Sequence, residues 1–290
     1  MLKCSLCPKK CGARRPDQRG LCGADVLRLG RAAPHYYEEP PVSGTNGSGA
    51  LFFSGCPMSC VFCQNHELSN AKTGKSVTVK RLAEIMLRLQ DEGCHNINLV
   101  SPTPYVPDII KALDIAKLEI PVVYNTSGYE RIETLKALDG YIDIYLPDFK
   151  YVTPALAERY SGAPDYPSVA SAALDEMLRQ RGGCEYGADG IMKRGVIVRH
   201  LVLPSNKDES EKVLVFLSQN YDKSKFLLSL MSQYVPMYRA CEFKEINRKL
   251  TKLEYRRVSE LALSLGFDGF FQEISSGKTE YTPEFDGTGV

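Results

Sequence analysis

The chain has 290 residues, of which 43% are hydrophobic, and its formal net charge is +1. That length and apolar content are enough for one large domain with a full core and a small appendage. The near-zero net charge argues against a general electrostatic hold on nucleic acid or on an acidic membrane. No apolar run reaches the roughly 18 residues of a membrane-spanning helix. We therefore expect no nucleic-acid partner and no membrane association.

Four of the ten cysteines lie in residues 1–24 in the pattern Cys-x2-Cys-x3-Cys-x10-Cys. They are Cys4, Cys7, Cys11 and Cys22. Glycine follows two of them and proline a third, which suits tight turns whose backbone N–H groups point at ligand sulfur. The segment has too few apolar residues for a core of its own, so we interpret it as metal-binding. Tetrahedral zinc and an auxiliary 4Fe-4S cluster both fit four thiolates, and the Cys-x2-Cys pair favours zinc.

The cysteines also indicate the compartment. An extracellular disulfide protein of this length needs a secretory leader, and the chain begins without an apolar leader segment. Clustered cysteines in such a chain are typical of metal ligands in a reducing environment. We expect a soluble cytoplasmic protein.

Residues 25–49 show no helical periodicity and end in the run Gly44-Thr45-Asn46-Gly47-Ser48-Gly49. We predict a loop that connects the first segment to the main domain. The adjacent carboxylates Glu38 and Glu39 precede two prolines, and such pairs are more often solvated than functional. Although they could line a site, we expect Glu38, Glu39 and His35 to be solvated.

Cys56, Cys60 and Cys63 form a Cys-x3-Cys-x2-Cys loop directly after the apolar run 50–53. Cysteine thiolates are the usual ligands of a 4Fe-4S cluster, so three of them hold three irons and leave the fourth open. A zinc knuckle or unconnected thiols are the alternatives, but structural zinc sites usually close with a fourth ligand. The spacing resembles that of radical S-adenosylmethionine (SAM) enzymes. The resemblance implies that SAM chelates the open iron and that an electron from the cluster cleaves it to methionine and a 5′-deoxyadenosyl radical.

From residue 50 onward, short apolar runs alternate with amphipathic stretches, which argues for a parallel sheet with helices outside. An unclosed (β/α)6 barrel fits the number of repeats, and the resemblance favours it over a doubly wound sheet. We therefore predict an α/β fold in which residues 50–290 form a partial (β/α)6 radical SAM barrel. The predicted strands are 51–54, 96–100, 121–124, 141–146, 196–202 and 226–230, and the predicted helices are 79–92, 106–116, 131–138, 212–219 and 253–265.

Two polar turns follow the second and third of these strands. Ser101-Pro102-Thr103-Pro104 stands where radical SAM proteins hold the SAM amino group with a Gly-Gly-Glu-Pro turn, but it lacks the glutamate. Backbone carbonyls and the hydroxyls of Ser101 or Thr103 remain as acceptors. Asn125-Thr126-Ser127-Gly128-Tyr129 resembles the Asp-Thr-Asn-Gly turn of pyruvate formate-lyase activating enzymes. By that resemblance Asn125 and Ser127 bind SAM, and Gly128 serves the backbone.

Charged residues stand at the end of the fourth predicted strand and within the fifth. Asp148 and Lys150 share a face of an extended chain and resemble the Asp-Leu-Lys segment of the same activating enzymes. They either bind the ends of an amino-acid-like group or pair with each other. Arg199 is a candidate for the SAM carboxylate, because guanidinium binds carboxylate bidentately, whereas His200 faces the other way and is predicted to be structural. By resemblance, Phe62 offers its backbone to adenine.

Together these segments resemble pyruvate formate-lyase activating enzyme-like proteins, in a branch with an N-terminal four-cysteine segment. The resemblance implies an oxidoreductase that abstracts a hydrogen atom, with a glycine of a partner protein as candidate target and a flavodoxin- or ferredoxin-like electron donor. A peptide or small metabolite as target is the alternative, and a non-catalytic metal-binding interaction module is the second. An open cluster is oxygen-sensitive, which favours an anaerobic setting. Of the remaining cysteines, Cys94 and Cys241 are predicted to be structural, while Cys184 lies in a glycine-rich loop that could meet a substrate.

Overall fold

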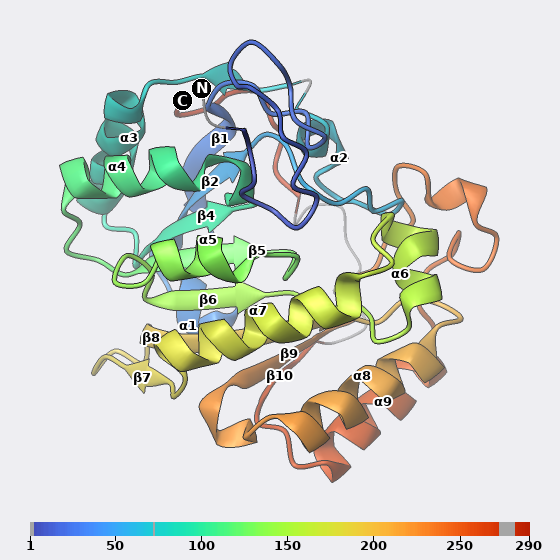
Figure 1. Cartoon of the computed structure of the whole chain (residues 1–290). Helices are drawn as coiled ribbons and strands as arrows, with labels where there is room; N and C mark the ends of the chain where they lie inside the picture. Colours follow the sequence, from blue (N-terminus) through green and yellow to red (C-terminus); the bar gives the residue numbers. More distant parts are fainter. Residues whose placement is uncertain (1–2, 72, 273–281) are drawn as a thin grey trace.

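The computed structural model describes residues 3–71, 73–272 and 282–290. Its strands form a single ten-stranded sheet with the order β10-β9-β8-β6-β5-β4-β2-β1-β3, in which β7 pairs with β8 alone (Figure 1). The strands are β1 (Arg28–His35), β2 (Ser48–Phe53), β3 (Lys75–Ser76), β4 (Ile97–Val100), β5 (Val122–Thr126), β6 (Ile144–Pro147), β7 (Glu185–Tyr186), β8 (Met192–Leu201), β9 (Leu227–Met231) and β10 (Gly269–Phe271). The α-helices are α1 (Pro40–Ser43), α2 (His66–Ser69), α3 (Val79–Asp91), α4 (Val106–Ala116), α5 (Ile132–Ala137), α6 (Pro154–Ser161), α7 (Tyr166–Arg181), α8 (Lys207–Asn220) and α9 (Lys252–Ser264).

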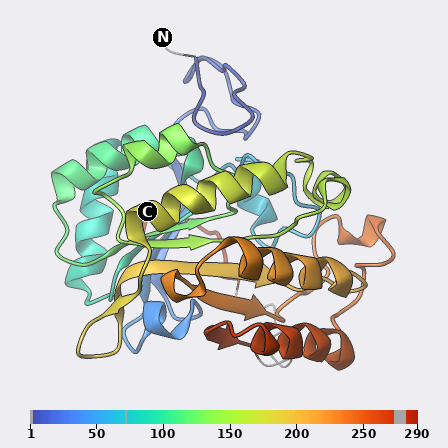
Figure 2. The same ribbon diagram turned by 60° about the horizontal axis from the view of Figure 1, so that its bottom comes forward.

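The sheet is a partial barrel because its parallel strands follow one another without reversal. Strands β2, β4, β5, β6, β8, β9 and β10 pair in parallel in that order. Right-handed crossovers that all advance in one direction place every connecting helix on the same face. The helices accordingly lie along the outside (Figures 1 and 2). Among the described strands none joins β10 to β1 or β3, so the barrel stays open, as predicted.

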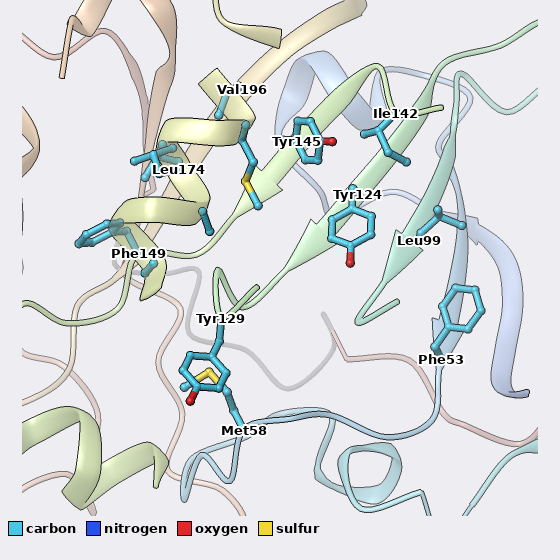
Figure 3. Packing of buried hydrophobic residues seen from close by; sticks show 14 of the residues in the cluster. Phe53, Met58, Leu99, Tyr124, Tyr129, Ile142, Tyr145, Phe149, Leu174 and Val196 are labelled. Carbon is cyan, nitrogen blue, oxygen red and sulfur yellow. The ribbon is translucent and has the colours of Figure 1, made fainter. Parts of the chain in front are cut away.

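The main core fills the space between the sheet and these helices. Helix α3 contributes Leu82, Ile85, Met86 and Leu89, which are the apolar positions that its helical spacing predicted, and all four are buried. They meet strand residues such as Leu99. Tyr124 and Tyr145 pack edge to face on neighbouring strands, with ring centroids 6.0 Å apart (Figure 3). Buried residues along the strands therefore pack the sheet against the helices. The polar turns follow at the carboxyl ends of the strands.

The prediction that residues 25–49 are loop is wrong for β1, for α1 and for the first two residues of β2. Strand β1 pairs antiparallel with β2 and extends the sheet, and the short helix α1 follows it. In β1 the buried residues are Leu29, Gly30 and Ala32 and the others are partly buried, so the strand shows no regular alternation. Arg31 and Pro34 contribute to this irregularity, and proline is tolerated in a strand near the sheet edge.

Helices α6 and α7 were not predicted, although both lie within the single crossover from β6 to β8. Helix α7 carries polar residues on much of its surface, so its apolar face is narrow. No helix in the part of the chain that the structure describes is long and apolar enough to cross a membrane.

Candidate iron-sulfur and ligand site

One cavity of about 220 Å³ opens at the carboxyl ends of the parallel strands. It collects residues from the cluster loop after β2, from the turns after β4, β5 and β6, and from the end of β8 itself, because the ends of parallel strands meet at one edge of a sheet. The predicted site residues that line it are Cys56, Cys60, Cys63, Phe62, Ser101, Asn125, Ser127, Asp148, Lys150 and Arg199. Positions far apart in the sequence therefore converge, with Thr103 as the exception described below.

The loop that carries the three cysteines is fixed by backbone hydrogen bonds to distant segments. Ser59 and Val61 donate to the carbonyls of Ser161 and Tyr160 at 3.1 and 2.9 Å, at the end of α6. The Val61 carbonyl accepts from Arg239 at 2.9 Å. The Phe62 ring packs against Tyr234 with centroids 6.0 Å apart. The three thiols are thus presented to the cavity by a loop held on both sides.

Burial raises the pKa of all three thiols in this loop. For Cys63 the value is about 12, and the neighbouring Cys60 adds to the effect. Backbone N–H groups of Met58 and Asn65 act in the opposite direction on Cys56 and Cys63. The Cys60 sulfur lies 3.1 Å from the Ser161 hydroxyl. Without a cationic centre these thiols stay protonated, so metal binding would release protons.

The turn after β4 places Ser101 and Thr103 differently. Ser101 lines the cavity with φ of +57°, a left-handed conformation that a non-glycine residue adopts at a cost. Thr103 is 2% exposed, and among the described residues that line the cavity it does not appear. Its hydroxyl donates to Glu130 at 2.6 Å. The prediction that Thr103 faces SAM is therefore not supported by its position, since helical winding after Pro102 turns its side chain away.

Glu130 is a buried residue that the sequence did not single out. Its Oε1 accepts from Thr103 and Thr126, the latter at 2.5 Å, so one carboxyl joins the turns after β4 and β5. Its Oε2 is buried without a hydrogen-bond partner. Burial raises the pKa of Glu130 to about 7. The residue acts as a brace behind the cavity.

The turn after β5 depends on Gly128 and on Tyr166 at the start of α7. Gly128 has φ of +77°, and a Cβ atom there would lie 2.3 Å from the Asp148 carbonyl oxygen. The Tyr166 hydroxyl is within 2.9 Å of the Ser127 carbonyl and 2.8 Å of the Asp148 carbonyl, and it accepts from the Lys150 N–H at 2.9 Å. The glycine lets the turns after β5 and β6 touch, as predicted for a backbone role, and the tyrosine fastens them.

A buried network of charged and amide groups forms one wall of the cavity. Arg199 donates to Asp148 at 2.9 Å and to Asn125 at 2.6 Å, and it lies 3.4 Å from Glu38. Glu38 also accepts from Asn98 and Asn125 at 3.0 and 3.1 Å. Asp148 and Lys150 pair with each other at 2.5 Å, which was one of the two predicted alternatives. Arg199 and Lys150 hold the pKa of Asp148 below its usual range despite burial.

Glu38, Glu39 and His35 are not solvated, contrary to expectation. The Glu38 side chain is 10% exposed and lines the cavity, and Glu39 is 8% exposed. Burial raises the pKa of both carboxyls, although Arg199 opposes it. His35 lines the cavity beside Phe52, and burial lowers its pKa to about 4. Strand β1 runs antiparallel to β2 and ends opposite Ser48, so the chain then enters at the amino ends of the parallel strands, from where Glu38 reaches Asn98 and Asn125.

The four N-terminal cysteines lie on the outer side of these turns. All four face a small cavity that they share with Arg15, Thr103 and Pro104. Backbone N–H groups of the segment lie at the sulfurs of Cys7, Cys11 and Cys22. Within the described residues no three or more His, Cys, Asp or Glu side chains form a group that could hold a single metal ion. Zinc would therefore require the four N-terminal thiols to turn toward one common centre, whereas the irons of a cluster bind separate thiolates, as would also hold for Cys56, Cys60 and Cys63.

The remaining residues behave mostly as structural ones. His200 is 1% exposed and lies 2.7 Å from the Phe149 carbonyl and 2.9 Å from the Ser210 hydroxyl, as predicted for a structural histidine. Cys94 is buried, whereas Cys241 is exposed. Cys184 is partly buried next to β8 and is not among the described residues that line the cavity.

Two solved structures resemble this fold at a distance. One is SuiB of Streptococcus suis bound to the precursor peptide SuiA, at 15% identity and a TM-score of 0.47 over 81% of this chain and 45% of SuiB. The other is HydG, a maturase of the [FeFe]-hydrogenase, at 15% identity and a TM-score of 0.48 over 74% of this chain and 48% of HydG. The chain spans less than half of either structure, and likenesses this weak say nothing about substrate.

Sequence comparison is more informative about family. An uncharacterized protein of Methanocaldococcus jannaschii, MJ0674, is 32% identical over 275 residues, which cover 91% of this chain and 75% of the relative. The model of the radical SAM superfamily matches residues 51–216, more than half of the chain, including the cysteine loop and the turns after β4, β5, β6 and β8. The chain therefore belongs to the radical SAM superfamily, which implies a 4Fe-4S cluster and SAM as its cofactors.

Proposed function

We propose that this protein is an enzyme that cleaves SAM reductively and uses the resulting radical to abstract a hydrogen atom from a substrate. The observation that carries the proposal is the convergence of Cys56, Cys60 and Cys63 with the turns after three parallel strands and with Arg199 of β8 around one cavity. Three thiols on one anchored loop leave a fourth iron without a protein ligand, as the chemistry requires. A non-catalytic metal-binding module gives no reason for that convergence.

The residues present fit both cofactors. Cysteine thiols are the donors that an iron-sulfur cluster takes, and such a cluster supplies the electron for SAM cleavage. Lys150 and Arg199 are the two Lys or Arg side chains among the described residues that line the cavity, while Glu38 and Asp148 supply carboxylates. These cations and carboxylates pair with one another in the structure, and an amino-acid group would exchange those partners for its own carboxylate and ammonium. Asn125 and Ser127 add uncharged polar groups for the ribose or methionine portion of SAM.

For the target we propose a glycine of a partner protein, with electrons from a flavodoxin- or ferredoxin-like donor. The support is the resemblance of the turn 125–129 and of Asp148 and Lys150 to the corresponding segments of pyruvate formate-lyase activating enzymes. The task of the protein is then to hold the SAM-derived carbon against the target and to exclude water. A peptide or a small metabolite is the competing target.

We also propose that Cys4, Cys7, Cys11 and Cys22 bind zinc or a second 4Fe-4S cluster. The support is that the four thiols face one small cavity and that backbone N–H groups lie at three of the sulfurs. Iron, sulfide and zinc analysis of anaerobically purified protein distinguishes the two metals.

Reductive cleavage is tested directly with the reconstituted protein. With SAM and dithionite it should release 5′-deoxyadenosine, and Cys60→Ala should release none, because the loop then offers two thiolates. The matched control is Cys241→Ser, at an exposed cysteine away from the loop. Turnover by Cys60→Ala equal to that of the wild type would overturn the proposal.

The target is tested with isotopes and electron paramagnetic resonance (EPR). A glycyl-radical doublet on a candidate partner protein supports the protein target. Transfer of deuterium from a labelled peptide or metabolite into 5′-deoxyadenosine, without such a doublet, favours the competing target.

A further inference from the structure

We propose that the metal-loaded N-terminal segment clamps the cluster loop and the SAM-side turns in place, and that Arg15 transmits its state to the cavity. The clamp is defined as residues 3–24. The inference rests on the proposed function and on the proposed metal site, and it adds a regulatory role for both. Figure 2 shows this segment projecting from the rest of the chain at the top of the view.

Arg15 joins a candidate metal ligand to the turn after β4. One guanidinium nitrogen, Nη2, donates to the Cys22 sulfur at 3.3 Å. The other, Nη1, donates to the Pro104 carbonyl at 2.5 Å. The same rigid, planar group therefore contacts both sites at once. A metal-bound sulfur keeps its thiolate character, and an ionised partner strengthens a hydrogen bond from guanidinium.

The Cys22-Gly23 turn also packs closely against the start of the cluster loop and against the segment just after α2. A Cβ atom at Gly55, where the loop begins, would lie 2.9 Å from the Cys22 carbonyl oxygen. A Cβ atom at Gly23 would lie 2.3 Å from the carbonyl oxygen of Asn70, just after α2. Both glycines have positive φ, so the close approach and the backbone conformation each require glycine. The clamp thus contacts the chain on either side of the three cluster cysteines.

Three side chains fasten the other end of the clamp to the barrel. Arg131 and Thr134, at the start of α5, donate to the carbonyls of Ser5 and Leu6 at 2.6 and 2.7 Å. Lys9 donates to the Gly162 carbonyl at 2.7 Å, and its ammonium lies 5.5 Å from the centre of the Tyr129 ring. Residues 3–24 therefore touch the segments after β2, β4, β5 and β6.

The brace at Glu130 continues this path inward. It holds Thr103, next to the Pro104 that Arg15 contacts, and Thr126, next to the cavity residues Asn125 and Ser127. A shift of the turn after β4 is therefore shared with the turn after β5.

A metal is what would make such a clamp firm. Residues 3–24 contain no helix or strand and few apolar side chains, so packing alone orders them weakly. Binding of a metal by four thiolates supplies ordering free energy to a segment of this kind. Loading the metal would thereby stabilise the contacts of Arg15 and of the Cys22-Gly23 turn, and losing it would loosen them.

The decisive experiment measures SAM affinity in a double-mutant cycle. Cys4→Ser/Cys11→Ser removes two ligands but keeps Cys22 as the partner of Arg15, and Arg15→Ala removes the link but keeps every thiol. Each should weaken SAM binding about tenfold, and combining them should weaken it little further because both act on one contact. Affinity is read from the change that SAM causes in the EPR spectrum of the reduced cluster. If the loss of SAM affinity in the combined variant equals the product of the two separate losses, the two changes act independently and the clamp is overturned.

Two measurements on the same variants complete the test. Cys4→Ser/Cys11→Ser should lose zinc, or iron with sulfide, while Arg15→Ala should keep its metal; equal metal content in all proteins would overturn the second site. Arg19→Ala is the matched control, because Arg19 belongs to the same segment but pairs with Asp25 at 3.0 Å. It should bind metal and SAM as the wild type does, and a loss equal to that of Arg15→Ala would show a nonspecific effect and contradict the role of Arg15.

Failure of the clamp can be separated from failure of the proposed function. If the wild-type protein neither binds nor cleaves SAM, the proposed function is wrong. The clamp is then judged by amide hydrogen exchange at residues 55–63 and 101–106, which should be faster in both clamp variants than in Arg19→Ala. Unchanged exchange would overturn the clamp, whatever the outcome with SAM.

Discussion

The two groups of cysteines in this chain have similarly short spacings but occupy opposite sides of the same turns. Cys56, Cys60 and Cys63 line the cavity, whereas Cys4, Cys7, Cys11 and Cys22 lie on the outer side, against Pro104 and the cluster loop. Spacing along the chain indicates metal ligands in both cases. The role of each group depends on its surroundings. The cluster cysteines face the charged groups of the cavity, whereas the N-terminal cysteines face the outer side of the turns.

The two groups also differ in how they are held. The cluster loop is fixed by backbone hydrogen bonds to residues 160, 161 and 239, which are part of the barrel. The N-terminal segment is held largely by side chains, among them Arg15, Lys9, Arg131 and Thr134. Side-chain contacts on an otherwise irregular segment are easier to undo. The firmly held cluster loop therefore suits catalysis, and the more easily released N-terminal segment suits regulation of SAM binding.

The sharpest test of this comparison removes one cysteine from each group. Cys63→Ala should abolish release of 5′-deoxyadenosine, because three irons can no longer be held. Cys11→Ala should leave cleavage measurable but reduced, with weaker SAM binding. Product is quantified after incubation with SAM and dithionite. Complete loss in both variants, with both proteins folded, would break the distinction between the two centres.

Removing the buried guanidinium of the cavity should have the next largest effect. Arg199→Ala leaves Glu38 without its cation and Asp148 with Lys150 alone, and breaking a buried pair costs about 3–5 kcal/mol of folding stability. Arg256→Ala breaks an exposed pair with Glu260 and should cost about 0–1 kcal/mol. Urea unfolding compares the two variants. Similar losses of unfolding free energy in the two variants would mean that the ion pairs of the cavity contribute no more to stability than an exposed pair.

The brace between the two regions predicts a pH dependence. The pKa of Glu130 is raised from 4.5 to about 7, so between these values the folded protein holds a proton that the unfolded chain has released. The corresponding stability, about 3 kcal/mol, is fully present below the unfolded pKa and is lost as pH rises through the folded pKa. Glu130→Gln should flatten the fall in unfolding free energy between about pH 5 and pH 8. If unfolding free energy falls with pH as steeply in Glu130→Gln as in the wild type, another group than Glu130 causes the fall.

The smallest difference concerns the two glycines that follow cysteines in the clamp. Gly12 and Gly23 have φ of +66° and +80°, so alanine is strained at both, at about 1–3 kcal/mol each. Only at Gly23 does the new methyl group collide with the barrel, 2.3 Å from the Asn70 carbonyl oxygen just after α2, since at Gly12 the nearest atom is 4.0 Å away. Gly23→Ala should therefore weaken SAM binding more than Gly12→Ala does. Equal losses of SAM affinity in the two variants would contradict the proposal that the Cys22-Gly23 turn acts on the cavity.

Much of the fold could be predicted from the sequence because its elements are locally encoded. The amphipathic spacing of Leu82, Ile85, Met86 and Leu89 indicated α3 nearly to its ends, and the strand-helix alternation indicated the parallel sheet. Strand β1 and helices α6 and α7 were missed. Their polar and apolar residues do not alternate cleanly, so their structure depends on the partners against which they pack.

The site was predictable where its residues follow strands. Asn125, Asp148 and Arg199 could be placed at one edge because parallel strands end together. Glu38 could not, because it reaches the cavity from the connector only after β1 returns the chain along β2. Glu130 and Tyr166 act from behind the turns, and their contacts join residues up to 39 positions apart.

The sequence by itself determined the spacing of both cysteine groups and the order of the polar turns, since these are properties of neighbouring residues. Only the tertiary structure decided that Thr103 turns away from the cavity, that Glu38 enters it, and that Arg15 connects Cys22 to Pro104. Such relations join segments that are distant along the chain, and they exist only once the sheet has brought the strand ends together.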